Sequence, residues 1–327
     1  MRIKFPWTVA FALCMALPLS KASAQLITFD FPGATMTAPI AITGNKIGGQ
    51  YKDSLGVLHG FVYDGSSFKS FDYPGASSTS VNYISGSTIL GEFYDNSGAY
   101  HGFLFDGVAF HQFDYPGAAN TRLVGEEGNI LVGSYDNVPG GPHHGFTYDG
   151  STFTTINYPG ALVTSISSIS SGIITGWFDA ASNGSRHGFS YDGTTFTEYT
   201  FPGAFVTVVN DLEGGTFAGT YSLGNNYFNH GFIYDGASYN TVDFPGATAT
   251  AINGRYGSKI VGQYSNPGST DLVHGFVSVP EVNNPLIYLT CILALSIVYK
   301  VCKRGDRTRQ LINVFARSGL FVKQRMF

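Results

Sequence analysis

The sequence predicts an all-β fold, a six-bladed β-propeller of four-stranded blades, and three observations lead to it. Of the 327 residues, only 12% are Asp, Glu, Lys or Arg, whereas 42 are Gly and 15% are aromatic, a composition typical of short strands and tight turns. The triplet His-Gly-Phe recurs six times, at spacings of 42 to 44 residues. Each repeat reads as four strands, and four strands per ~40–45 residues is the pattern of a propeller blade.

Three motifs mark every repeat, so chance does not explain them. The histidines of His-Gly-Phe are His59, His101, His144, His187, His230 and His274. The fourth residue after the glycine of each Pro-Gly-Ala is a threonine, namely Thr37, Thr79, Thr121, Thr164, Thr207 and Thr250. A Gly-x-aromatic motif begins at Gly49, Gly91, Gly133, Gly176, Gly219 and Gly262.

In the second repeat, for example, the expected strands are 79–85, 89–94, 101–105 and 110–115. An Asp-Gly turn joins the last two, because both turn positions tolerate a positive φ, and Pro-Gly supplies the turn to the next repeat. The first strand is expected to line the central channel and the fourth to form the outer edge, although the opposite phase stays open. The turn aspartates that fit this hairpin chemistry are Asp64, Asp106, Asp149, Asp192 and Asp235.

The two ends of the repeat region complete one blade between them. Residues 27–31 have the pattern of a fourth strand but precede every other strand, and the last repeat stops after its third strand, at 276–279. One N-terminal strand and three C-terminal strands therefore predict a three-plus-one closure that leaves no open sheet edge. The propeller is expected to span residues 25–279.

Residues 1–24 have the features of a secretory signal peptide. Arg2 and Lys4 precede an apolar run over 9–19, and Ala22-Ser23-Ala24 forms a small-residue cleavage site ahead of Gln25. The alternative is a buried N-terminal strand. A cleaved signal peptide predicts that the repeat region is exported.

The C-terminal region divides into three parts. Residues 280–285 form a linker, residues 286–302 are apolar and reach the ~17 residues of the shortest membrane-spanning helices, and residues 303–327 are basic. Basic residues after the apolar segment favour a cytoplasmic tail. The expected location is therefore secreted or cell-surface, with a single membrane anchor and the propeller outside; a helix docked on the propeller is the alternative.

Charge and cysteine content exclude several classes of function. Residues 26–279 carry 7 basic and 20 acidic groups, which argues against a nucleic-acid partner, because phosphate binding needs a basic face. The only cysteines, Cys14, Cys291 and Cys302, lie outside the repeats, so disulfides, thiol nucleophiles and cysteine zinc sites are excluded there. No cofactor is expected.

Over residues 27–279 the chain resembles the extracellular HAF-repeat family of bacteria. The resemblance lies in the unit His-Gly-Phe-x-Tyr-Asp-Gly, followed by x-Phe-x-x-x-Asp-Tyr-Pro-Gly-Ala, with glycine in place of that family's middle alanine. The resemblance implies an exported repeat protein and transfers no catalytic residues.

The C-terminus resembles the PEP-CTERM sorting signal, in which Val-Pro-Glu-Pro precedes a short apolar helix and a basic cluster. Val279-Pro280-Glu281 match that box, Val282 replaces the second proline, and 23 residues follow Arg304. This resemblance implies an exosortase as a partner. The residues after Arg304 fit either an amphipathic segment on the inner membrane surface or a read-through.

The six motif histidines are expected to be structural. Third strands lie about 10 Å outside the innermost strands, at ~4.8 Å per strand step, so these imidazoles do not converge on one metal, and a local hydrogen bond in each blade explains their recurrence. His143 and His144 beside Asp136 are a metal candidate, with a solvated loop as the alternative. The prediction is therefore that the protein holds no metal.

A ligand site is expected where the repeats differ. One variable position lies inside Gly-x-aromatic, and the other positions are the polar residues of the first strands. The candidates are Gln50, Glu92, Trp177 and Gln263 from the former, and Asn82, Glu126, Asp211, Glu213 and Asn253 from the latter. Trp177 and Glu92 suit a sugar, through stacking and hydrogen bonding, and ordinary solvated variation is the alternative.

These features favour a non-catalytic surface protein for binding, adhesion or the extracellular matrix, with polysaccharide or another surface protein as its partner. No P-loop, G-x-S-x-G, H-E-x-x-H or EF-hand motif is present. One alternative is a glycosidase or lyase that uses Glu126, Asp211 and Glu213 at the channel mouth. Another is structural coat material without a ligand.

Overall fold

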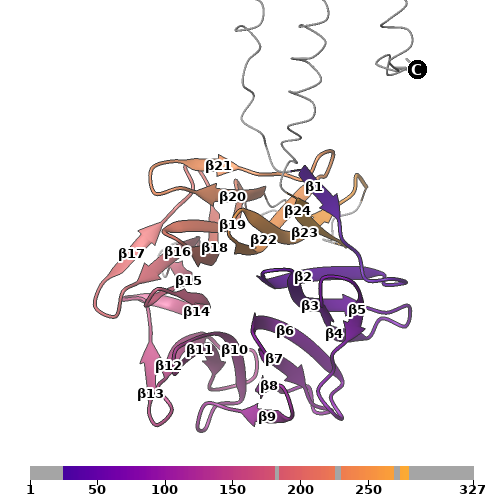
Figure 1. Cartoon of the computed structure of the whole chain (residues 1–327). Coiled ribbons are helices and arrows are strands. Elements are labelled where there is room, and N and C mark those ends of the chain that lie inside the picture. Colours follow the sequence, from indigo (N-terminus) through magenta and orange to yellow (C-terminus); the bar gives the residue numbers. More distant parts are fainter. Residues whose placement is uncertain (1–24, 181–183, 225–229, 269–272, 280–327) are drawn as a thin grey trace, which may run out of the picture. The chain divides into compact units, whose positions relative to one another are not determined.

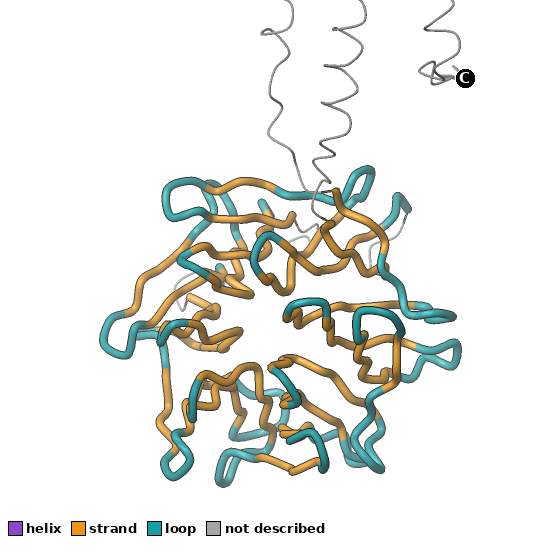
Figure 2. Tube along the Cα trace, viewed as in Figure 1, coloured by secondary structure: helices purple, strands orange, loops and turns teal. Residues whose placement is uncertain are grey.

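The computed structural model describes residues 25–180, 184–224, 230–268 and 273–279, and these form strands and connecting loops without a helix (Figure 2). No helix of this part of the chain is long and apolar enough to cross a membrane. The predicted signal peptide (1–24), linker (280–285), membrane or sorting helix (286–302) and basic tail (303–327) lie outside the described residues.

The strands form six antiparallel, four-stranded blades around a central axis (Figure 1). Blade 1 consists of β2 (Met36–Thr43), β3 (Lys46–Lys52), β4 (Leu58–Tyr63) and β5 (Phe68–Ser70). Blade 2 consists of β6 (Ser78–Ser85), β7 (Thr88–Tyr94), β8 (Tyr100–Phe105) and β9 (Phe110–Phe113). Blade 3 consists of β10 (Asn120–Glu127), β11 (Ile130–Asp136), β12 (His143–Tyr148) and β13 (Phe153–Ile156).

The other three blades follow the same order. Blade 4 consists of β14 (Ala161–Ser170), β15 (Ile173–Ala180), β16 (Arg186–Tyr191) and β17 (Phe196–Tyr199). Blade 5 consists of β18 (Val206–Glu213), β19 (Thr216–Ser222), β20 (His230–Tyr234) and β21 (Tyr239–Thr241). Blade 6 consists of β22 (Ala249–Tyr256), β23 (Lys259–Ser265), β24 (His274–Val279) and β1 (Gln25–Thr28). A parallel bridge between Arg186 and Val206 also joins blades 4 and 5.

The predicted three-plus-one closure is confirmed. Strand β1 pairs antiparallel with β24, from Gln25 opposite Val279 to Thr28 opposite Phe276. The six-bladed fold therefore rests on hydrogen bonds between the two ends of the described chain, which lie 254 positions apart in sequence but side by side in blade 6 (Figure 1).

The first strand of each blade lies nearest the axis, as predicted (Figure 1). Each of these strands carries a β-bulge at the same position of the repeat, because its register with the second strand shifts by one residue there. The bulged residues form a ring around the channel, here called the bulge ring: Ile40, Asn82, Val124, Ser167, Asn210 and Asn253.

The two ends of the channel differ. One end, here called the loop face, carries the loops between second and third strands and the Pro-Gly-Ala connections. The other end, the turn face, carries the short turns between first and second strands and the Asp-Gly turns. Gln25 and Val279 pair beside the start of β23, so the described chain enters and leaves the propeller on the turn face.

The hydrophobic core lies between neighbouring blades. The phenylalanines of the His-Gly-Phe motif are completely buried, namely Phe61, Phe103, Phe146, Phe189, Phe232 and Phe276. Phe146, for example, packs with Leu123 and Leu131 of its own blade and with Leu90 of blade 2. The aromatic residue before each Pro-Gly stacks on the second-strand aromatic residue, as Tyr73 does on Phe93 at 3.7 Å between ring centroids and 2° between planes. Packing between blades thus uses the fixed residues of the repeat.

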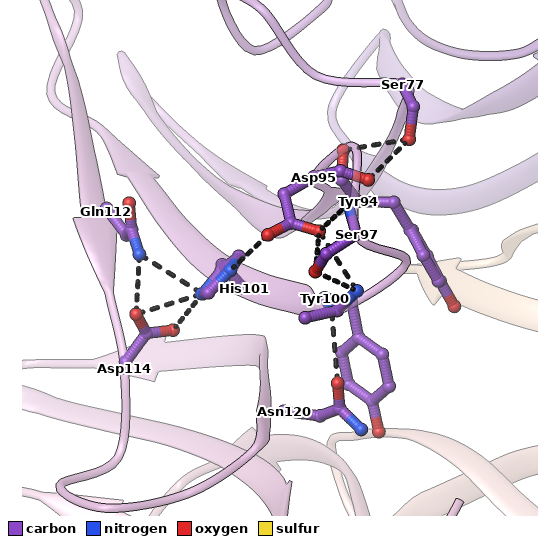
Figure 3. A network of polar contacts seen from close by, with 10 residues as sticks. Ser77, Tyr94, Asp95, Ser97, Tyr100, His101, Gln112, Asp114 and Asn120 are labelled. Carbon is purple, nitrogen blue, oxygen red and sulfur yellow. Dashed lines mark hydrogen bonds and ion pairs between the residues drawn. The ribbon is translucent and has the colours of Figure 1, made fainter. Parts of the chain in front are cut away.

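Each motif histidine makes a local side-chain contact with the residue that follows, or lies just beyond, the fourth strand of its blade. His101 Nδ1 lies 3.0 Å from both carboxylate oxygens of Asp114, and its Nε2 lies 3.7 Å from Asp95 (Figure 3). Equivalent Nδ1 contacts join His59 to Asp72, His144 to Asn157, His187 to Thr200, His230 to Asp243 and His274 to Asp30.

The fourth strand is shorter than the sequence predicts. Strand β9 ends at Phe113, and not at residue 115 as predicted. In the equivalent position of blade 1, the Asp72 carboxylate accepts the N–H of Gly60, which the backbone of a longer fourth strand would otherwise bind. In blade 1 an aspartate side chain therefore takes the place of backbone pairing just beyond the fourth strand, which no strand pattern in the sequence reveals.

The motif threonines and the turn aspartates also have structural contacts. Each threonine hydroxyl accepts the N–H of the aromatic residue before Pro-Gly; Thr79 accepts it from Tyr73 at 3.0 Å. The aspartates of the Asp-Gly turns accept turn amides, and the N–H of Ala109 is the main cause that lowers the pKa of Asp106 to about 2. These residues stabilise the scaffold and form no shared site.

The glycine of His-Gly-Phe lies against the fourth strand. A Cβ at Gly60 would come within 2.3 Å of the carbonyl oxygen of Phe71, so an alanine at this position requires the two strands to move apart. Glycine and alanine are therefore not interchangeable in this repeat without a shift of the backbone.

Candidate functional site

The central channel contains two cavities that meet at the bulge ring. The cavity toward the loop face has a volume of about 280 Å³, and the cavity toward the turn face about 210 Å³. All six residues of the bulge ring line both cavities. Because each blade contributes one residue to this ring, residues some 43 positions apart in sequence become neighbours only at the axis.

Six of the nine predicted ligand residues line the loop-face cavity, namely Gln50, Asn82, Glu92, Trp177, Asn253 and Gln263. Asp211 and Glu213 line the turn-face cavity, and Glu126 is in neither lining. The fold thus gathers the variable residues of four Gly-x-aromatic motifs at the loop-face end of the channel. Asp211 and Glu213 lie toward the other end.

Two repeats do not present this variable position to the cavity. Ser134 is buried, and its hydroxyl accepts the N–H of Ile166 at 2.9 Å. Thr220 is also buried, and its hydroxyl accepts a hydrogen bond from Asn210 at 3.3 Å. The ligand-binding surface is therefore asymmetric, although the scaffold is nearly sixfold.

The asparagines of the bulge ring connect adjacent blades. Asn82 donates to the carbonyl of Leu123 at 3.1 Å, and Asn210 donates to that of Ile252 at 2.7 Å. Asn253 donates to the carbonyl of Pro39 at 2.9 Å, across the junction between the last and the first blade. Their amide nitrogens hold the channel together, and the amide oxygen of Asn82 accepts from the Ser80 hydroxyl at 2.9 Å.

Trp177 is held in place by charged neighbours. The guanidinium of Arg186 lies 3.6 Å from the centroid of the indole ring and donates to both carboxylate oxygens of Asp179, at 2.8 and 3.1 Å. The His143 ring meets the indole edge-on, at 6.3 Å between centroids. One face of the indole is therefore covered, and the ring is fixed at the cavity wall.

The histidine pair predicted as a metal candidate is divided between two networks. The buried Asp136 contacts Nδ1 of His143, accepts from Tyr100 Oη at 2.7 Å and accepts from Asn120 at 3.3 Å. His144 instead contacts Asn157. The described residues contain no group of three side chains arranged to bind a metal ion. Burial and the hydrogen bond to Asp136 raise the pKa of Tyr100, which keeps this phenol protonated.

Arg122 is a residue of the loop-face cavity that the sequence prediction missed. It lies beside Glu92 of the preceding blade, with 3.6 Å between Nε and Oε2, and the side chains are 31% and 16% exposed. The equivalent residues of the other first strands are small or aliphatic: Ala38, Ser80, Ser165, Val208 and Ala251. Arginine occurs in this position in one repeat only, and residues 26–279 contain only 7 basic residues, so this arginine was the signal that could have identified the site.

The carboxylates of the turn-face cavity are bound to the scaffold. Asp211 accepts from the Ser168 hydroxyl at 3.0 Å, from its neighbour Leu212 at 2.8 Å and from the N–H of Arg255 at 2.7 Å, so it links blades 4, 5 and 6. Glu213 accepts the N–H of Gly257 in the turn of blade 6. Despite these hydrogen bonds, burial raises the pKa of Asp211 to about 6.

The raised pKa of Asp211 predicts that the protein becomes more stable below neutral pH. The folded state binds this proton at about pH 6, and the unfolded chain binds it only near 3.8, so the free energy of unfolding falls as pH rises from about 4 to 6 and stays lower above 6. Between pH 7 and 5 we expect a gain of about 1–1.5 kcal/mol. Thermal unfolding of the wild type and of Asp211→Asn measures this, because other titrating groups are common to both proteins. Parallel pH profiles would contradict the assignment.

Comparison with known proteins gives a likeness to solved structures alone, at low sequence identity. No protein-family model matches the chain, and no curated protein matches it. Solved structures similar to it include a six-bladed β-propeller lectin of Aleuria aurantia (13% identity, TM-score 0.47, covering 78% of this chain and 98% of that chain). They also include the SapL1 lectin in complex with α-methyl fucoside (12%, 0.49, 77% and 98%) and a puromycin-hydrolysing peptidase of Mycobacterium tuberculosis (11%, 0.48, 80% and 55%).

Proposed function

We propose that this protein is an exported β-propeller that binds carbohydrate without catalysis, through the cavity at the loop face of its channel. The observation that supports the proposal is the composition of this 280 Å³ cavity, whose lining includes Trp177, the Glu92–Arg122 pair and the amides of Gln50, Asn82 and Gln263. Its size is near the lower end of the ~300–1,000 Å³ of small-molecule sites. It suits one or two sugar rings better than a folded partner.

The side chains suit a sugar because they combine an aromatic ring with many hydrogen-bonding groups. A pyranose presents hydroxyls on its edge and C–H groups on its faces, so it needs polar partners around it and an apolar surface beneath it. The indole of Trp177 is rigid and supplies that surface at little cost in side-chain entropy, because Arg186 already fixes it.

The strand order is compatible with display on a cell surface. Gln25 and Val279, the two ends of the described chain, both lie at the turn face, at the opposite end of the channel from the loop-face cavity. Export by a signal peptide, membership of the HAF-repeat family and sorting by an exosortase belong to this proposal and rest on the sequence motifs.

The geometry does not favour the glycosidase or lyase alternative. A retaining or inverting glycosidase needs two carboxyl groups free to act on one bond. Of the three carboxylates considered, Glu126 lines neither cavity, and the carboxylates of Asp211 and Glu213 accept backbone N–H groups. For Asp211 and Glu213, these contacts explain the carboxylates without invoking catalysis.

Replacing Trp177 by alanine is expected to weaken carbohydrate binding by about tenfold or more, because it removes the apolar surface of the site. The measurement uses intact, unpermeabilised cells that display the full chain and fluorescent oligosaccharides from a glycan array. Trp177→Phe, which retains a ring, is expected to bind with an intermediate affinity. If no glycan binds to wild-type cells or to the purified chain, carbohydrate binding is refuted; if only the purified chain binds, surface display is refuted.

A further inference from the structure

Glu92 and Arg122 form a charge pair whose hydrogen-bonding capacity the fold leaves unused. The 3.6 Å between Nε and Oε2 is too long for a hydrogen bond. The Nε of Arg122 is buried and has no hydrogen-bond partner among the described residues, and no described side chain or amide donates to the Glu92 carboxylate. Both side chains line the loop-face cavity.

Such a pair is unusual because buried polar groups are nearly always hydrogen-bonded. The other carboxylates near the channel follow this rule: Asp211, Glu213 and Asp179 each accept hydrogen bonds from backbone amides or from arginine. The Glu126 carboxylate has no such donor, but it lies outside both cavities. Glu92 and Arg122 are therefore the charged groups that face the loop-face cavity with donors and acceptors to spare.

We propose that Glu92 and Arg122 together bind adjacent hydroxyls of a sugar ring, so that the ligand class is a neutral pyranose; this rests on the proposed function. A hydroxyl group both donates and accepts a hydrogen bond. One hydroxyl accepts from a terminal guanidinium nitrogen of Arg122, whose side chain is 31% exposed, and donates to Glu92; its neighbour donates to the second carboxylate oxygen. Adjacent hydroxyls thus satisfy both members of the pair, and hydrogen bonds to charged groups are the stronger kind.

Charged sugars also carry hydroxyls, but their charge meets a like charge at this pair. A uronate brings acceptors for Arg122 but a negative charge against Glu92, in a repeat region that carries 20 acidic and 7 basic groups. An amino sugar brings donors for Glu92 but a positive charge against Arg122. Arg186 does not change this balance, because Asp179 pairs with its guanidinium.

The test measures, by calorimetry on the full chain, the affinity for three sets of probes: neutral gluco-, galacto- and manno-oligosaccharides, oligogalacturonate and chitosan oligosaccharides. We expect a neutral oligosaccharide to bind most tightly, and Glu92→Gln to weaken its binding by about 10- to 100-fold. Arg122→Met is expected to have an effect of similar size. Glu126→Gln, a carboxyl change in the neighbouring blade outside both cavities, is the matched control and is expected to leave the affinity unchanged.

The outcomes separate this inference from the proposed function. If a neutral sugar binds and Trp177→Ala weakens it, but Glu92→Gln and Arg122→Met do not, the pair has no role in recognition and the inference is wrong, while carbohydrate binding stands. A preference for oligogalacturonate or chitosan also overturns the inference alone. If none of the probes binds, both proposals fail. Circular dichroism and melting temperature show whether each variant is folded.

Discussion

Deletion of residues 25–31 is expected to prevent closure of the propeller and to lower its melting temperature by at least about 10 °C, because about 5 kcal/mol or more of stability is lost. The deletion removes β1, which pairs with β24 over four residues. It also removes Phe29 and Phe31, which pack in the core between blades 6 and 1, and Asp30, which binds His274 and Gly275. A loss of this size is comparable with the total stability of many domains.

The control for this deletion is a peptide of residues 25–34 added in trans. If β1 acts by pairing with β24, the peptide is expected to restore the melting temperature toward that of the intact chain, and a scrambled peptide is not. Thermal unfolding followed by circular dichroism measures both. A deleted chain that melts with the intact one would show that blade 6 does not need its fourth strand.

Replacement of Phe146 by alanine is expected to lower the free energy of unfolding by about 3–5 kcal/mol. This ring is completely buried between blades 2 and 3, where it contacts Leu90, Leu123 and Leu131, and the rigid sheets on either side cannot close over the space it leaves. Chemical denaturation of the full chain measures the change.

Two further variants of blade 3 locate the origin of this effect. Phe146→Leu retains much of the volume and is expected to cost considerably less. Val138→Ala removes an apolar side chain that is 57% exposed and is expected to change the stability by at most about 0.5 kcal/mol. Equal losses for Phe146→Ala and Val138→Ala would be incompatible with a core located between the blades.

The blades were predictable because each is built from local patterns. The Asp-Gly and Pro-Gly turns, the alternation of apolar residues and the six recurrences of His-Gly-Phe place most strands within a few residues of the observed ones. The closure was also predictable, since the first strand has the pattern of the one that the last repeat lacks. The early end of β9 was not, because no strand pattern shows that a side chain can take a backbone donor there, as Asp72 takes the N–H of Gly60 in blade 1.

The candidate site was predictable only in part. Glu92 and Trp177 stood out because they occupy a position where the repeats differ, and the structure places both in one cavity. Arg122 was missed although it is one of few basic residues of the propeller, and nothing in the spacing of Glu92 and Arg122 reveals that they meet across two blades. Ser134 carries the same sequence signal as Glu92 but is buried, because it binds the backbone of the next blade.

The sequence alone determined the number of blades, the order of strands within them and the structural roles of the repeated histidines, threonines and turn aspartates. These follow from interactions over a few to a few tens of residues, which each repeat contains in full. Only the tertiary structure decided which strand lines the axis, that β-bulges form a ring there, and that Glu92, Arg122 and Trp177 share a cavity while Glu126 does not. Those facts depend on closure of the propeller, because residues from different repeats meet at the axis only after all six blades are in place.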